Sequence, residues 1–356
     1  MNSKMTHFRS AQTVAAAVVL FFLSTACEVA GQDQQIGIID LYGLSRVPAD
    51  QVRAALTFKE GDTISFEGHE RPAFLTASET RLTALPGVVR ARIYPVCCDQ
   101  GRAIVYVGVE ETGAPTMQFR AAPQGDARLA PDIVQAGEEF SKALTLAVQQ
   151  GHAEEDRSEG HALNRDPALR AIQERFLAFA KRDLSGLRLV LRSSSEATHR
   201  ALAAQVLGYT TDKQAVVEDL VQGMADPSEE VRNNAMRALM VFADTVQSVN
   251  RPTPRIPPQP FIELLKSLTW SDRNKASAAL LALSANRDPE LLAMLRKQVL
   301  TSLVEMARWK SAGHALAPFM IVGRLAGYSD DAAFALWERG DRETVINAAV
   351  KAMNSR

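Results

Sequence analysis

Two histidines and three carboxylates lie close together in the middle of the chain, as His152, Glu154, Glu155, Asp156 and His161. Imidazole nitrogens and carboxylate oxygens are ligands for metal ions, so a metal site is one interpretation of this segment. The segment has no HExxH pattern or equivalent spacing that would fix the ligands on one helix face. We therefore predict a solvated loop here and no bound metal.

Two adjacent cysteines, Cys97 and Cys98, are the next residues that offer chemistry. Neighbouring side chains of a strand point to opposite faces, so a disulfide between them would need a strained turn. Neither has cysteine or histidine partners at the spacing of a metal site. An oxidising compartment would allow a vicinal disulfide or a bond to another chain. A structurally tolerated thiol pair is the alternative.

Motifs of nucleophilic, nucleotide-dependent and redox chemistry are missing from the sequence. It contains no Gly-x-Ser-x-Gly, phosphate-binding loop, dinucleotide fingerprint or Cys-x-x-Cys. We interpret His199 and His314 as parts of helix interfaces. No catalytic residue and no cofactor is therefore predicted. Four aromatic residues lie at the ends of helical segments and could anchor a peptide or fill the core, namely Tyr209, Trp270, Trp309 and Tyr328.

Composition limits the class of partner. The chain has 356 residues, and its 40 basic and 41 acidic residues leave a net charge of -1. Nucleic-acid binding would require a clustered excess of lysine and arginine, which is absent, so we predict protein partners. The length favours two domains, or one domain and a repeat array.

The first 31 residues have the pattern of an export signal. Lys4 and Arg9 precede a short apolar run over residues 13–23, and Ser24 and Ala26 suit a signal-peptidase site. We expect a periplasmic or extracellular protein. The alternatives are an uncleaved N-terminal anchor and a lipid anchor at Cys27, although the residues before Cys27 are one position out of step with a lipoprotein signal.

Residues 32–111 predict a small α+β domain. The apolar run 36–41 indicates a strand, and helices are predicted around Val52–Leu56 and over residues 77–85. Residues 88–94 and 103–110 alternate as two further strands. The predicted order is β-α-α-β-β.

This order and several short motifs resemble a POTRA domain, a module found beside outer-membrane β-barrels and in cell-division proteins. The matching motifs are the strand ending in Gly43, Lys59-Glu60-Gly61-Asp62, Leu85-Pro86-Gly87-Val88 and the closing Val109-Glu110-Glu111. The resemblance implies that a partner strand can add to an edge of the sheet. No β-barrel follows in this sequence, so the resemblance does not extend to transport.

Residues 112–166 have the composition of a linker. Glycine, alanine, proline and glutamine dominate their first half, which predicts a hinge-like segment with little to bury. One helix is predicted within it, over residues 133–150.

From residue 167 to the C-terminus the sequence predicts an all-α solenoid, because a frame that is Arg-x-x-Ala-x-x-Ala-Leu at Arg232 and Arg273 recurs with substitutions at Arg200, His314 and Ile346. Its central small residue should allow neighbouring helices to approach closely. In the copy over residues 226–240, Ser228 is the predicted N-cap, and Arg232 and Arg237 are predicted to face solvent. The five copies place the central alanine at Ala203, Ala235, Ala276, Ala317 and Ala349.

These units resemble HEAT repeats, and their short spacing is closest to the HEAT-like repeats first named in phycobilin lyases. The resemblance implies a scaffold with a concave binding face. We therefore predict an exported, non-catalytic adaptor that binds proteins through this face and the sheet edge, as in an envelope or secretion assembly. The alternative is an enzyme or enzyme-accessory protein of the lyase type that uses the groove of the solenoid.

Overall fold

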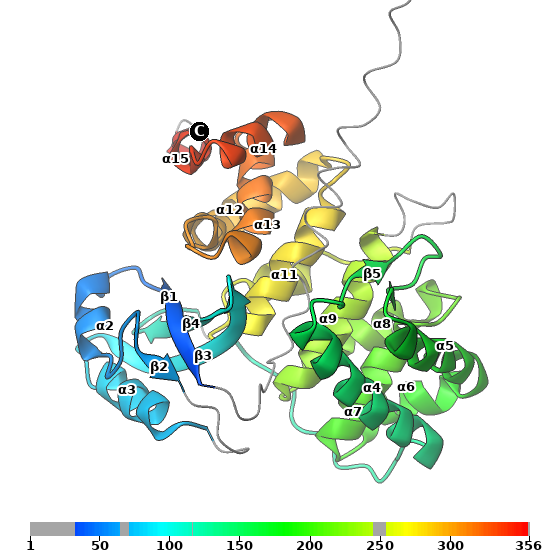
Figure 1. The fold of residues 1–356 in the computed structure, drawn as a ribbon. Helices are drawn as coiled ribbons and strands as arrows, with labels where there is room; N and C mark the ends of the chain where they lie inside the picture. Colours follow the sequence, from blue (N-terminus) through cyan, green and yellow to red (C-terminus); the bar gives the residue numbers. More distant parts are fainter. Residues whose placement is uncertain (1–32, 65–70, 116, 245–253, 355–356) are drawn as a thin grey trace, which may run out of the picture. The chain divides into compact units, whose positions relative to one another are not determined.

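The computed structural model describes residues 33–64, 71–115, 117–244 and 254–354. The predicted signal segment and Cys27 lie outside these residues. The chain divides into two compact units (Figure 1). Unit 1 comprises Met1–Met117, Leu265–Trp270 and Asn286–Arg356, and unit 2 comprises Gln118–Leu264 and Ser271–Ala285. Unit 1 therefore contains both ends of the described chain, and these units do not follow the consecutive domains expected from the sequence.

The N-terminal part of unit 1 is a four-stranded mixed sheet with two helices. Its elements are β1 (Gln34–Tyr42), α2 (Ala49–Ala55), β2 (Thr63–Ile64), α3 (Ala73–Thr83), β3 (Val88–Asp99) and β4 (Arg102–Glu111). The strand order is β2-β1-β4-β3, with β4 parallel to β1 and antiparallel to β3. The observed order matches the predicted β-α-α-β-β with the short β2 added. Gln100 and Gly101 both have positive φ and close the tight β3–β4 turn.

Alternation along the strands gives this sheet two different buried faces. Ile39, Val105 and Val107 belong to the hydrophobic core that includes residues of α2 and α3. The intervening residues Tyr42 and Tyr106 are fully buried against other partners. The Tyr42 hydroxyl donates to the Leu268 carbonyl at 2.6 Å, and the Tyr106 hydroxyl lies 2.6 Å from His314 Nδ1, so this face packs against the Leu265–Trp270 segment and the C-terminal part of unit 1. That part consists of α12 (Pro289–Ala307), α13 (Ala312–Leu325), α14 (Asp330–Glu338) and α15 (Arg342–Asn354).

Unit 2 is built mainly of paired helices. They are α4 (Pro131–Gln149), α5 (Pro167–Arg182), α6 (Leu184–Ser193), α7 (Ala197–Leu207), α8 (Gln214–Gly223), α9 (Glu229–Asp244), α10 (Gln259–Leu264) and, except for Trp270, α11 (Trp270–Leu283). A two-stranded hairpin of β5 (Glu155–Asp156) and β6 (Leu163–Asn164) lies between α4 and α5. Asp166 caps α5, accepting from the amides of Ala168 and Leu169.

The central alanines of the repeating frame lie in the interior, as predicted. All five have at most 1% of their surface exposed. A methyl group built on Gly223 of α8 would lie 3.1 Å from the Cβ of Ala235 of α9, and one on Gly323 of α13 would lie 2.8 Å from the Cβ of Ala333 of α14. These distances are too short for a larger side chain, so small residues set the helix spacing.

Candidate functional site

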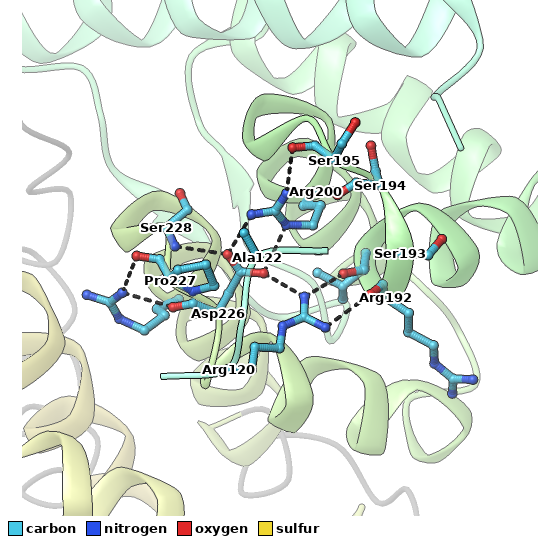
Figure 2. Close-up of polar contacts among 12 residues, drawn as sticks. Arg120, Ala122, Arg192, Ser193, Ser194, Ser195, Arg200, Asp226, Pro227 and Ser228 are labelled. Carbon is cyan, nitrogen blue, oxygen red and sulfur yellow. Dashed lines mark hydrogen bonds and ion pairs between the residues drawn. The ribbon is translucent and has the colours of Figure 1, made fainter. Parts of the chain in front are cut away.

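Buried arginine–aspartate pairs connect successive repeats of unit 2. Asp226 is fully buried after α8 and accepts from Arg200 of α7, with Nη2–Oδ1 at 2.8 Å and Nε–Oδ2 at 2.9 Å (Figure 2). The Ser228 amide also donates to Asp226 at 2.9 Å. Burial acts to raise the pKa of Asp226, but the hydrogen bonds from Arg200 and from Arg120 outweigh it and lower this pKa. The carboxylate is thus held ionised in the interior.

Arg232 makes the corresponding pair one repeat later, and the prediction that it faces solvent is wrong. Its side chain is 2% exposed and binds the fully buried Asp272 of α11, with Nε–Oδ1 at 2.9 Å. Its Nη1 donates to the carbonyls of Asp226 and Pro227. The helical pattern around Arg232 placed it outside the apolar stripe, but its carboxylate partner lies 40 residues further along the chain.

The first half of the predicted linker is bound beside these arginine–aspartate pairs. We call residues 118–130 the strap, and residues 191–196 and 225–228, which join successive helices, the loop edge. The Arg120 amide donates to the Ala225 carbonyl at 2.8 Å. The Arg120 side chain donates to the carbonyls of Leu191 and Arg192 and, at 2.6 Å, to Asp226 Oδ2 (Figure 2). The guanidinium carbon of Arg232 lies 4.0 Å from the ring centroid of Phe119, the residue before Arg120.

The second half of the strap contacts the preceding loop. Gly125 donates its amide to the Ser193 carbonyl and accepts from the Ser195 amide, both at 2.8 Å. A methyl group on Gly125 would lie 2.6 Å from the Ser193 oxygen, so the close approach requires glycine. Arg128 reaches Ser194 Oγ and Ser195 Oγ, at 3.4 and 3.2 Å. The expectation of a hinge-like segment is wrong for the strap, because Arg120, Gly125 and Arg128 are hydrogen-bonded to the loop edge.

The loop expected to be solvated contains a buried ionic cluster. Glu155 is 5% exposed at its side chain and pairs with Arg157 of the same hairpin and with Arg237 of α9. Arg157 also donates to Asp244 at 2.7 Å. Burial acts to raise the pKa of Glu155, but the two arginines lower it to about 2. The predictions of a solvated loop and of an Arg237 facing solvent are therefore wrong for these two residues.

Lys275 of α11 lies near the same charges. It is 2% exposed, and burial together with the neighbouring Arg237 lowers its pKa to about 7. Two carboxylates and two arginines already balance one another in this cluster. Burial and the positive charges of Arg237 and Arg157 oppose protonation of Lys275, and together they outweigh the opposite effect of Glu155.

A second polar cluster lies in unit 1, where the sheet meets α13. His314 Nδ1 is 2.6 Å from the Tyr106 hydroxyl and 3.1 Å from Ser311 Oγ. Asp40 accepts from the Lys310 amide at 2.9 Å and from the Ser311 amide at 3.3 Å, ahead of the first turn of α13. Burial raises the pKa of Asp40 and raises that of Tyr106 well above its ordinary value.

Serine, histidine and aspartate thus meet in unit 1, but their geometry is that of a structural junction. The hydroxyls of Ser311 and Tyr106 approach the same histidine nitrogen, while the described bonds of Asp40 go to backbone amides. A hydrolytic triad would instead require the carboxylate to orient the histidine. The cluster joins strands β1 and β4 to the beginning of α13. His314 also lies against Trp270, the first residue of α11, with ring centroids 5.0 Å apart, so it takes part in a helix interface and packs against the sheet as well.

The predicted aromatic anchors lie mostly in the interior. Trp270 and Trp309 are buried around Tyr106, with each ring centroid 4.9 Å from that of Tyr106. Tyr209 is buried against Phe176 in unit 2, and its hydroxyl accepts from Gln173 at 2.9 Å. These three fill the core in this structure, whereas Tyr328 is partly exposed between α13 and α14.

Cys97 and Cys98 belong to β3, and their side chains lie outside the described part of the structure. The predictions of a disulfide or thiol pair there remain predictions. The described residues contain no group of three or more histidine, cysteine, aspartate and glutamate side chains placed to hold a metal ion. Within the same residues, no helix is both long and apolar enough to cross a membrane.

The sheet edges expected to bind a partner strand are capped by side chains. Ile93, in the middle of edge strand β3, donates its amide to Glu79 Oε1 at 2.7 Å and accepts from Arg71 at 2.7 Å. Pro95, two residues further along this edge, has no amide hydrogen. On β1, the Ile39 amide donates to Glu60 and its carbonyl accepts from Arg53. Strand addition at these positions would have to break charged contacts.

Several residues that build these clusters were not recognised from the sequence alone. Asp40, Tyr106, Arg120 and Asp272 had no motif around them. One signal was present: arginine recurs at the first position of the repeating frame, at Arg200, Arg232 and Arg273, and all three are buried. A charged residue that recurs in register with an apolar frame indicates a paired interior position.

Comparison with protein families finds a match to HEAT repeats within the helical array of unit 2. Residues 184–250 match the family model for HEAT repeats. The match covers α6 to α9, the part of unit 2 that carries the Arg200–Asp226 pair and the loop edge. A search of curated proteins finds no match. The chain thus contains a helical repeat region of the HEAT type together with an N-terminal mixed sheet.

Proposed function

We propose that the protein is an exported, non-catalytic scaffold that binds protein partners through its helical array. The observation that carries the proposal is the HEAT-repeat match over residues 184–250, because HEAT-type repeats generally mediate protein–protein interactions. The internal chemistry of the array is consistent with this role. Its buried arginines and aspartates pair with one another and fix the helix positions, as a rigid binding platform requires.

The sheet would contribute less to binding than the POTRA resemblance implies. Its strand order and its β-α-α-β-β core support that resemblance. However, Glu79 and Arg71 occupy both backbone groups of Ile93, so the β3 edge offers few free partners to an added strand. We infer that the sheet serves mainly to anchor the C-terminal helices of unit 1, leaving partner binding to the array.

Export is supported by the sequence of the first 31 residues. The basic residues, the short apolar run and the small residues at the cleavage position have the order of a signal peptide. The mass and N-terminal sequence of the protein recovered from each cell fraction test this part. A cytoplasmic protein with an intact N-terminus would contradict it.

Site-specific crosslinking in cells tests the binding role. A photoreactive residue at Leu189 of α6, which is 57% exposed, should capture a discrete set of proteins. The same residue at exposed Gln51 of α2 is the matched control and should capture far less. Equal capture at both positions would contradict binding through the array. Stoichiometric metal or chromophore in the purified protein would favour the lyase-type alternative.

A further inference from the structure

The two loops that hold the strap are equivalent positions of neighbouring repeats. Arg200 donates Nη1 to the carbonyls of Ser194 and Ser195, six and five residues before it. Arg232 donates Nη1 in the same way to Asp226 and Pro227, again six and five residues before it. Ser194 and Asp226 are therefore corresponding residues, and the loop edge presents a repeated surface.

The two arginines of the strap bind both parts of the loop edge, and Arg120 bridges them, because it donates to the carbonyls of Leu191 and Arg192 as well as to Asp226. Arg128 lies at the Ser194 loop and Arg120 at the Asp226 loop, eight residues apart in the chain. Between them, Gly125 makes two main-chain hydrogen bonds that resemble a single parallel strand bridge with Ser194. The strap is thus an extended segment whose two arginines and Gly125 bind acceptors of both parts of the loop edge.

The chemistry of the loop edge favours a guanidinium group. The acceptors of Arg120 are two carbonyls at the C-terminal end of α6 and the Asp226 carboxylate. The C-terminal end of a helix carries partial negative charge, which adds to the charge of the carboxylate. A planar guanidinium can donate to several such acceptors at once, and a lysine ammonium fits them less well.

The strap is held mostly by polar contacts. Leu129 is its one fully buried apolar side chain among the described residues, and Phe119 is only partly covered. Arg128 is 40% exposed and pairs with a Glu196 that is 54% exposed. Exposed pairs of this kind contribute about 0–1 kcal/mol each. Arg120 is held more firmly, because its side chain is 18% exposed and pairs with the fully buried Asp226, so a competing segment has to supply a guanidinium group to the same carboxylate.

We propose that the loop edge is a recognition site for an extended, arginine-bearing segment of a partner protein, which the strap occupies in cis. The inference rests on the proposed scaffold function and names the class of partner segment. Because the strap is tethered, its effective concentration at the loop edge is on the order of millimolar, and a partner at micromolar concentration binds only when the strap is displaced. The strap therefore limits access to the site.

The test uses the full chain and a labelled synthetic peptide of residues 118–130. The Arg120→Ala/Arg128→Ala protein should show faster hydrogen exchange at the amides of residues 120 and 125. It should also bind the peptide at least about tenfold more tightly than the wild-type protein does, because the tethered competitor is weakened. Gln124→Ala is the matched control, since the Gln124 amide contacts only the Ala122 carbonyl of the strap itself among the described contacts. It should behave as wild type.

A peptide with alanine in place of both arginines should not bind, which separates arginine recognition from non-specific attachment. If the double variant unfolds by circular dichroism, the measurement is repeated with the Arg128→Ala protein, because Arg128 is more exposed than Arg120. Released strap without peptide binding would overturn the proposal, and so would unchanged hydrogen exchange. Crosslinking of straps between two copies would also overturn it, because the occupant would then be a second copy. The assay uses purified components, so its result is independent of the cellular crosslinking.

Discussion

Glu111, at the end of β4, makes one of the most sharply testable contributions to stability. Its carboxylate is 1% exposed at the side chain and accepts from the amides of Ser45, Arg46 and Val47 at 2.9–3.0 Å, and from the Ser45 hydroxyl at 2.5 Å. It thereby holds the loop between β1 and α2. Burial acts to raise the pKa of Glu111, but these hydrogen bonds lower it from an ordinary 4.5 to about 2.

The size of this contribution follows from the pKa difference. A difference of one in pKa corresponds to about 1.4 kcal/mol, so the ionised carboxylate stabilises unit 1 by at most about 3 kcal/mol at pH 7. The folded pKa lies below the unfolded one, so this stability is fully present above pH 4.5 and is lost as the pH falls through 2. About 1.4 kcal/mol of it should remain at pH 3. Glu111→Gln should therefore cost about 2–3 kcal/mol at pH 7, and clearly less at pH 3.

Tryptophan fluorescence during urea unfolding is a suitable assay. The three tryptophans, Trp270, Trp309 and Trp337, all belong to unit 1, so their signal follows that unit alone. Glu343→Gln in the same unit is the control, because Glu343 and its partner Arg308 are 56% and 50% exposed, so this variant should cost less than about 1 kcal/mol. Equal losses for the two variants, or a Glu111→Gln loss that does not shrink at low pH, would refute the reasoning.

Three further predictions concern packing and charge. Ala235→Leu should destabilise unit 2 by about 1–3 kcal/mol, because Gly223 leaves no space for a larger side chain, and thermal unfolding by circular dichroism measures it. Gly108→Ala should lower the urea midpoint of the fluorescence transition, because the new methyl would lie 2.4 Å from the Tyr42 ring. Lys275 has a pKa of about 7 in the folded protein and an ordinary value of 10.5, so the unfolded chain binds more protons between these values. The free energy of unfolding should therefore rise from pH 7 to pH 10.5, and Lys275→Met should flatten that rise.

Much of the fold could be predicted because it follows from local patterns. A helix is predicted over residues 133–150 and α4 is observed over Pro131–Gln149, since an apolar stripe that includes Phe140 and Leu144 marks it. The small residues of the repeating frame were also interpreted correctly, because close helix packing imposes the same requirement in every unit. Such signals are contained within one helix or one repeat.

The clusters could not be predicted because their partners are distant in sequence. Arg232 and Asp272 are 40 residues apart, and Tyr106 and His314 are 208 apart. A helical pattern shows that Arg232 lies outside the apolar stripe of its helix, but it does not show that the buried Asp272 carboxylate lies opposite it. The prediction for the strap was wrong for a similar reason. Its composition is that of a linker, and the acceptors of Arg120 lie on helices and loops far from it in sequence.

Unit 1 combines the N-terminal sheet with the last four helices, and this has a consequence for biosynthesis. The strands of the sheet are made first, but Trp309 and His314, which pack against Tyr42 and Tyr106, follow only after about two hundred further residues, which form most of unit 2. During synthesis, the apolar outer face of the sheet would have to wait uncovered, and contacts of such long sequence separation form slowly. A chain truncated before α12 should therefore depend on chaperones to stay in solution, even though every strand of the sheet is present.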